Sequence, residues 1–417
     1  MTLIKKIFFN DNKKIKEKSI IWNFIASMLN AAITAYMLMI VTRYIGVIDG
    51  GILAIASTLG YQLLTIGNYG MRNFQATDTK KIFSFKEYLT SRYITSIIMI
   101  ISLFVIVLFR NYSMHKSLIV IFFVLFKWID AYEDVYHGYY QLNERLDVAC
   151  REQSYRYIFS LLVFTIGIIV TNNLVISCVL TFVSSLSFFL IFNGIIQHEF
   201  NLTKNIKKDN IVRLLKECFP LFISSCLYLY ICNSPKYAID SVLNDEIQSY
   251  FGVLFMPVFL INLISLLIYR PLLTKLANYW NNKEISNLVN KIIRQVLMIS
   301  SLTVAEIIFA YFFGTELLGF VYKMNLSSYK LELSLLMIGG GLNALVGFFL
   351  SIITIIRTQK STVIGYGIVS LIALLFSNFV VGKYKILGAA ILYDILLLIL
   401  ALYVIITFVI KFKKTSK

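Results

Sequence analysis

The sequence predicts an all-α integral membrane protein of about twelve transmembrane helices in two six-helix lobes, with both termini cytoplasmic. Hydrophobic residues make up 58% of the 417 positions and charged residues only 15%, whereas soluble domains carry roughly 25% charged residues. Apolar stretches of about 20 residues, enough to cross a hydrocarbon core of about 30 Å, recur from Ile20 onwards. Basic residues collect in every second gap between these stretches.

The apolar stretches place the expected helices in order and leave no room for a soluble domain. The first stretch is too long for a signal peptide, so we expect it to remain as a helix. The expected spans are residues 20–44, 49–69, 88–110, 117–142, 152–172, 174–197, 212–235, 247–270, 287–313, 331–357, 360–382 and 386–410.

The basic residues indicate the orientation of these spans. When the N-terminus is assigned to the cytoplasm, most of the 39 Lys and Arg residues fall at inner loops or inner helix ends, as the positive-inside rule requires. The net charge of +17 is therefore interpreted as a topology signal and as contact with anionic lipid head groups, not as nucleic-acid binding.

A longer inner loop around residues 201–210 divides the chain into an N-terminal lobe, residues 1–200, and a C-terminal lobe, residues 201–417. The two halves share a weak similarity, because Arg43-Tyr44 ends the first span and Lys236-Tyr237 ends the seventh. If this match is not a coincidence, the halves are parallel repeats, an arrangement that places a transporter's substrate site between them.

The fourth expected span carries an unusual polar stripe. Spacings of three and four residues place its members on one helical face: Lys127, Asp130, Asp134, His137 and Gln141. Charged residues are costly in a membrane and normally face a cavity or each other. The stripe therefore either lines a water-filled cavity or forms an internal ion pair between Lys127 and one of the two aspartates.

Isolated acids occur in two other spans, Glu306 in the ninth and Asp394 in the twelfth. A buried carboxyl can take up a proton or help to coordinate a cation. Together with Asp130 and Asp134 they are the candidates for coupling to H+ or Na+. The alternative is a carboxyl that stays neutral or pairs with a neighbouring helix.

Backbone breakers lie in the second half of the chain. Pro257 falls near the middle of the eighth span and should kink it, because proline removes a backbone hydrogen bond. The run Gly339-Gly340-Gly341 in the tenth span indicates a close helix contact or a hinge.

Motifs for enzymes are missing from the sequence. It contains no Gly-rich phosphate loop followed by Lys, no His-Glu-x-x-His and no Gly-x-Ser-x-Gly. The five cysteines and three histidines show no metal-ligand spacing, so we expect no metal and no cofactor. These observations favour a secondary transporter over an enzyme.

Several segments resemble the polysaccharide (O-antigen, Wzx-type) flippases of the multidrug/oligosaccharidyl-lipid/polysaccharide exporter superfamily. The resemblance covers nearly the whole chain. It rests on Val41-Thr42-Arg43-Tyr44-Ile45-Gly46 with Gly50-Gly51, on Tyr69-Gly70-Met71-Arg72-Asn73-Phe74-Gln75-Ala76-Thr77-Asp78, on Ser234-Pro235-Lys236-Tyr237-Ala238-Ile239-Asp240 before Tyr250-Phe251, and on Arg270-Pro271-Leu272-Leu273 before Leu276-Ala277.

The resemblance implies a bundle that alternates between inward-open and outward-open states in the bacterial cytoplasmic membrane. Its expected substrate is an undecaprenyl-diphosphate-type lipid carrying an oligosaccharide repeat unit for capsule, exopolysaccharide or O-antigen assembly, with a polymerase and chain-length machinery as further partners. A diphosphate needs fixed positive charge, and the expected substrate-binding residues are Arg43, Arg72, Lys127, Lys236 and Arg270. All except Lys127 lie at helix ends, where they could instead anchor the helix at the head groups.

Two alternatives remain open. An ion-coupled multidrug exporter of the same superfamily would need an acidic cavity, which the four acids named above would supply. A membrane polysaccharide polymerase is less favoured, because the expected outer loops are too short to carry a catalytic site.

Overall fold

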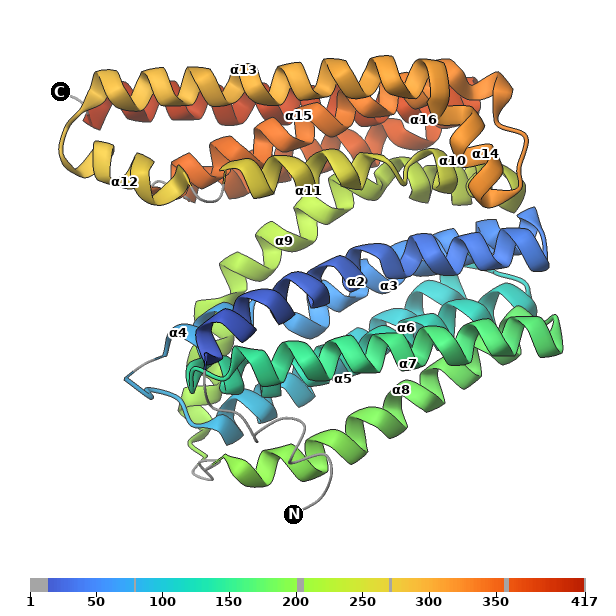
Figure 1. The fold of residues 1–417 in the computed structure, drawn as a ribbon, viewed down its shortest axis with the longest axis horizontal. Helices are drawn as coiled ribbons and strands as arrows, with labels where there is room; N and C mark the ends of the chain where they lie inside the picture. The colour runs from blue at the N-terminus through green and yellow to red at the C-terminus, as the bar shows by residue number, and fades with distance from the viewer. Residues whose placement is uncertain (1–13, 79, 201–205, 270–271, 356–359, 416–417) are drawn as a thin grey trace. The chain divides into compact units, whose positions relative to one another are not determined.

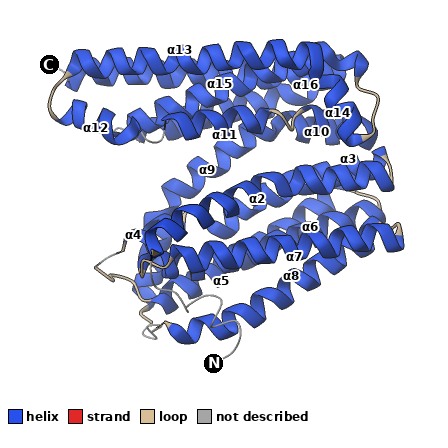
Figure 2. Ribbon diagram, viewed as in Figure 1, coloured by secondary structure: helices blue, strands red, loops and turns tan. Residues whose placement is uncertain are grey.

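The structure is a computed structural model that describes residues 14–78, 80–200, 206–269, 272–355 and 360–415. Within these ranges all regular elements are helices, as Figure 2 shows. The chain forms two compact units, Met1–Cys226 and Leu227–Lys417. The division falls inside helix α9 (Lys208–Val242), whereas the sequence places a boundary just before this helix.

The first unit is a helical bundle built around α6 (Figure 1). Helix α6 packs against α3, α8, α4, α5 and α7, and α2 packs along α7. The unit contains α2 (Ile15–Tyr44), α3 (Val47–Asn68), α4 (Met71–Thr77), α5 (Phe85–Arg110), α6 (Met114–Leu142), α7 (Leu146–Thr171), α8 (Leu174–Ile196), the short 3-10 helix η1 (Gln197–Glu199) and the first part of α9.

Polar residues lie at the ends of several helices of this unit, where short turns connect one helix to the next. Asn111 and Asn172 follow α5 and α7 in the left-handed conformation, with φ of 48° and 47°, which asparagine tolerates better than most residues. Helix α5 begins with a capping box, in which Ser84 and Glu87 each accept a hydrogen bond from the other's backbone N–H. These caps let apolar helices reverse direction within a few residues.

The second unit is organised around α15, which packs against α16, α11 and α13. It contains the last part of α9, then α10 (Asp245–Leu254), α11 (Val258–Tyr269), α12 (Leu273–Asn281), α13 (Ile285–Phe309), the π-helical turn η3 (Ala310–Gly314), α14 (Thr315–Tyr322), the 3-10 turn η4 (Ser327–Tyr329), α15 (Lys330–Ile355) and α16 (Lys360–Thr415).

Two expected irregularities are present in this unit. The eighth expected span is interrupted before Pro257, since α10 ends at Leu254 and α11 starts at Val258. Helix α16 covers the last two expected spans, and its backbone leaves helical geometry at Lys385, with φ of 50° and ψ of −130°. This break lies in the gap expected between residues 382 and 386.

Nine helices among the described residues are long and apolar enough to cross a membrane. Helix α6 is not among them, because its middle carries four charged residues: Lys127, Asp130, Glu133 and Asp134. Helices α10 and α11 are each short, and residues 362–410 count as one span. The chain is therefore multi-pass, while twelve spans and cytoplasmic termini remain predictions.

Candidate functional site

The polar face of α6 lies inside the first unit and not at its surface. Lys127 is 0% exposed, and Asp130, Glu133 and His137 are also buried. Charges in such surroundings are stable only when they are paired and hydrogen-bonded. The structure supplies those partners from α4, α5, α7 and α8.

The first group of partners surrounds Asp130. The Lys127 Nζ atom lies 3.0 Å from Asp130 Oδ2, and the Tyr157 hydroxyl donates to the same oxygen at 3.1 Å. Arg156, on α7, donates to Asp130 Oδ1 and binds both oxygens of Glu133, at 2.9 Å and 2.7 Å. Of the two interpretations of the polar stripe, the structure therefore shows the internal Lys127–Asp130 ion pair.

The second group surrounds Asp134. The buried Arg92, on α5, donates to Asp134 Oδ2 at 2.7 Å, and Arg72, on α4, lies 3.3 Å from Oδ1. Arg72 also approaches Gln141 Oε1 at 3.5 Å and remains 31% exposed. Two arginines thus share one carboxylate, and both of the expected stripe residues Asp134 and Gln141 contact the expected substrate residue Arg72.

The third group joins α6 to α7 and α8. His137 Nε2 lies 3.3 Å from Glu152 Oε2 and 3.8 Å from Glu133 Oε1. Asn193 donates to Glu152 Oε1 at 2.6 Å and accepts from the Tyr140 hydroxyl at 2.9 Å. All members of this group are buried.

Glu133, His137 and Glu152 form a possible metal-ligand set, because one ligand atom from each lies within 4.8 Å of the others. However, Arg156 already uses both oxygens of Glu133. Only His137 and Glu152 then have capacity for a metal, fewer ligands than zinc sites normally provide. The donor set fits a metal poorly.

In the second unit, Lys236 is a buried cation on α9, only 6% exposed. Its Nζ atom lies over the rings of Phe255, at 4.1 Å, and Phe259, at 5.8 Å. Aromatic faces attract a cation but leave its hydrogen bonds unmade. Among the residues that the structure describes, Lys236 has no carboxylate partner.

Two acids of the second unit are also incompletely paired. Glu306 Oε2, on α13, and Asp394 Oδ1, on α16, are buried atoms without a hydrogen-bond partner among the described residues. Asp394 lies against the glycine run of α15, where a Cβ on Gly339 would come within 2.4 Å of its Oδ1. These glycines therefore serve a close helix contact, the first of the two interpretations of the run.

The structure describes only one of the remaining two expected substrate residues. Arg43 is exposed at the end of α2. Arg270 lies outside the described residues. Of the expected substrate residues that the structure describes, Arg43, Arg72 and Lys127 belong to the first unit and Lys236 to the second.

Several charged partners in these groups were not predicted from the sequence: Arg92, Glu133, Glu152 and Arg156. Arg92 and Arg156 belong to the basic residues counted as inner-side topology signals, yet both are 0% exposed. The sequence did contain an indication of these partners, because each is a charged residue within or beside an expected span. A single sequence does not show which neighbouring helix such a residue faces.

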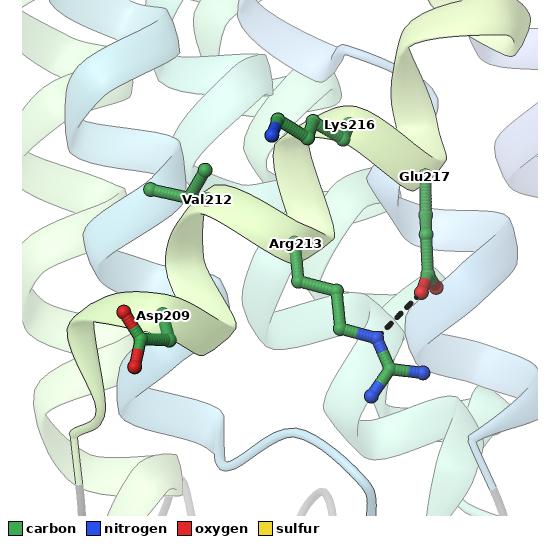
Figure 3. A pocket seen from close by; sticks show the side chains of 5 residues that line it. All are labelled: Asp209, Val212, Arg213, Lys216 and Glu217. Carbon is green, nitrogen blue, oxygen red and sulfur yellow. Dashed lines mark hydrogen bonds and ion pairs between the residues drawn. The ribbon is translucent and has the colours of Figure 1, made fainter.

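Of the surface pockets, one is formed along α9 alone. Figure 3 shows its residues Asp209, Val212, Arg213, Lys216 and Glu217, with Arg213 Nε donating to Glu217 at 2.7 Å. A second pocket of about 250 Å³ is lined by residues of α4, α5 and α6, including Gln75, Glu87 and Tyr139, together with Lys207 and Asn210. Glu87 accepts hydrogen bonds there from Lys207 N and from Asn210, both at 2.9 Å, so it fastens the start of α9 to α5.

Comparison with solved structures shows the fold. The chain is similar to the lipid II flippase MurJ in an inward closed conformation, with a TM-score of 0.72, 15% sequence identity, and coverage of 95% of this chain and 90% of that chain. It is also similar to an inward-facing multidrug resistance MATE family transporter of the MOP superfamily, with a TM-score of 0.67, 11% identity, and coverage of 95% and 98%.

A third similar structure is a MOP superfamily transporter from Pyrococcus furiosus, described as having a binding pocket of reverse polarity. It has a TM-score of 0.53 and 13% identity, and the match covers 100% of this chain and 98% of that chain. No protein-family model matches the sequence, and no curated protein matches it.

At these identities the similarity shows the fold alone. This chain is a multi-pass membrane protein with the fold of the MATE and MurJ transporters of the MOP superfamily. These neighbours belong to the superfamily that the sequence resemblance named. The solved structures named here are two transporters and a flippase.

Proposed function

We propose that this protein is a flippase that moves polyprenyl-diphosphate-linked oligosaccharide repeat units from the inner to the outer leaflet of the bacterial cytoplasmic membrane by alternating access. The repeat units would then be used by a polymerase and its chain-length machinery. The MurJ structure, titled a lipid II flippase, supports this proposal because it shares the fold. The short resemblances in the sequence support the polysaccharide branch.

The observation that carries the proposal is the state of Lys236. Burying an ammonium group without a counter-ion costs free energy, so a protein that keeps one has a use for it. A diphosphate crossing the membrane needs a cation that is not already neutralised. Lys236 meets this condition in the second unit, whereas Lys127 is neutralised by Asp130.

A cation-coupled multidrug exporter is a second candidate, and the fold is equally compatible with it. Asp394 and Glu306 favour this candidate, because each has a buried carboxylate oxygen without a partner among the described residues. In a flippase the same two acids would instead be coupling sites for H+ or Na+.

The test is transport in proteoliposomes that contain the purified protein and a fluorescent polyprenyl-diphosphate oligosaccharide. Replacing Lys236 with Met removes the charge and keeps the side-chain bulk. A hydrogen bond to a charged group contributes about 1.5–3 kcal/mol, so we expect flipping to slow by roughly ten- to a hundredfold. Lys383→Met, at an exposed position of α16, is the matched control and should leave flipping unchanged.

Unchanged flipping in Lys236→Met would remove the role proposed for Lys236. Absence of flipping by the wild-type protein, combined with efflux of organic cations from the same vesicles, would favour the exporter.

A further inference from the structure

The buried charges around α6 do not balance locally. Among the described residues, Lys127 contacts the carboxylate of Asp130, and Arg156 contacts those of Asp130 and Glu133. Two cations thus face two carboxylates in this group. Glu152 is a third carboxylate with 0% exposure, and no lysine or arginine among the described residues contacts it. If Glu152 is ionised and His137 is neutral, this buried group carries one negative charge in excess.

The neighbouring group of Arg72, Arg92 and Asp134 carries one positive charge in excess, but neither arginine contacts Glu152. Arg92 and Arg72 are both bound to Asp134, and Arg72 is 31% exposed, so water screens its charge. The titratable or charged groups around the His137–Glu152 pair are Glu133, Tyr136 and Tyr140 on α6, Arg156 on α7 and Arg72 on α4.

The other elements packed around the pair add only neutral contacts. Helix α8 contributes the neutral Asn193 to Glu152. Among the described residues, no charged side chain of α2 or α3 pairs with His137 or Glu152. No lysine or arginine among the described residues therefore contacts the pair, and a proton bound by the pair itself would neutralise Glu152 directly.

A single proton fits the charge and the geometry. With the proton on Glu152, its O–H donates to His137 Nε2; with the proton on the imidazole, the Nε2–H donates to Glu152 Oε2. Both forms use the same contact of 3.3 Å and make the buried group neutral. A divalent ion would instead leave one positive charge in excess and would find Glu133 occupied by Arg156.

We infer that the His137–Glu152 pair is a proton-binding site of the first unit, and that it releases its proton during the transport cycle. The second part rests on the proposed transport function. The pair joins α6 to α7, and through Asn193 to α8. Loss of the proton leaves Glu152 ionised beside Glu133, so protonation stabilises the packing of these three helices.

Infrared difference spectroscopy of the purified full-length protein over a pH series tests the site directly. The wild-type protein should show a carboxylic-acid C=O band from Glu152 that disappears as the pH rises. This band should be absent from Glu152→Gln, which resembles the protonated acid and keeps the contact with Asn193. Glu306→Gln, which changes a carboxyl of the other unit, is the matched control and should retain the band.

A second variant keeps the test independent of how well Glu152→Gln folds. His137→Gln removes the proton-sharing partner, so the midpoint pH of the Glu152 band should shift. A Glu152→Gln spectrum identical to that of the wild type, or a midpoint unchanged in His137→Gln, would overturn the proposal. Stoichiometric Zn²⁺ binding by calorimetry that is lost in Glu152→Gln would also overturn it, in favour of a metal site.

The transport part is measured separately. In the proteoliposome assay, flipping by the wild-type protein should change with pH over the range in which the band titrates, and flipping by Glu152→Gln should not. A titrating band with no flipping would contradict the proposed function and leave the proton site intact. Flipping that does not depend on pH would contradict the release of the proton and leave the flippase intact.

Discussion

Lys127 and Lys236 are both buried lysines on long helices, but their surroundings differ. Lys127 contacts Asp130 at 3.0 Å and lies 4.4 Å from the centre of the Tyr61 ring. Lys236 lies over aromatic rings and has no carboxylate partner among the described residues. The charge of Lys127 is therefore neutralised by Asp130 within α6. The charge of Lys236 remains available for a ligand.

This difference predicts opposite effects on stability. Lys236→Met removes an unpaired buried charge and should raise the thermal unfolding midpoint in detergent, since apolar replacement of buried charges can stabilise by about 1–4 kcal/mol. Lys127→Met removes a counter-ion of Asp130 and should lower the midpoint. Equal destabilisation by both variants would show that Lys236 is a structural residue.

The two arginines on Asp134 allow a second comparison. Arg92→Gln removes a fully buried guanidinium that donates to Asp134 at 2.7 Å, and breaking a buried pair costs about 3–5 kcal/mol. Arg72→Gln removes a partly exposed partner at 3.3 Å, and we expect a loss below about 1 kcal/mol. Chemical unfolding of the two variants in matched detergent measures the difference, and a larger loss in Arg72→Gln would contradict it.

For single residues, the sequence predicts the polar α6 residues of the stripe but not their partners on other helices. The spacing of Lys127, Asp130, Asp134 and His137 is enough to predict a polar face on α6. The partners Arg156 and Glu152 come from α7, and helix periodicity does not tell which neighbour a face meets. The sequence therefore predicted the polar face of α6 but not the residues of neighbouring helices that contact it.

Helices α10, α11, α15 and α16 show how backbone breakers shape single elements. Pro257 cannot donate a hydrogen bond, so the turn between α10 and α11 falls where the sequence places a kink. The break at Lys385 in α16 contains no proline, although Gly382 and Gly388 flank it, and it lies in the expected gap between two apolar stretches. A proline thus predicted the first irregularity, and a gap between apolar stretches predicted the second.

The glycine run of α15 predicts a sharp steric effect. A Cβ at Gly339 would lie 2.4 Å from Asp394 Oδ1 and from a carbon of the Tyr393 ring. Gly339→Ala should therefore destabilise the protein by about 1–3 kcal/mol through overpacking. Gly367→Ala, in α16, meets nothing within 4 Å and should be neutral or slightly stabilising. Thermal unfolding of both variants tests this, and equal midpoints would contradict the close contact.

For the whole molecule, apolar length and charge asymmetry predicted a multi-pass helical protein, and the sequence resemblance implied an exporter-type fold. They did not predict that the helix would continue through the kink at Lys385, so that residues 362–410 form one long helix. The substrate is harder to predict, because the same fold occurs in a lipid II flippase and in multidrug transporters. Only the charges that remain unpaired inside this fold distinguish these functions.

The measurement that tests the central claim most directly is mass spectrometry of polyprenyl-diphosphate lipids in cells depleted of this protein, with surface polysaccharide quantified alongside. We predict that complete lipid-linked repeat units accumulate and that the surface polymer is lost, with both restored by the wild-type protein and only weakly by Lys236→Met. Unchanged lipid intermediates together with a normal amount of surface polymer would contradict the proposed flippase.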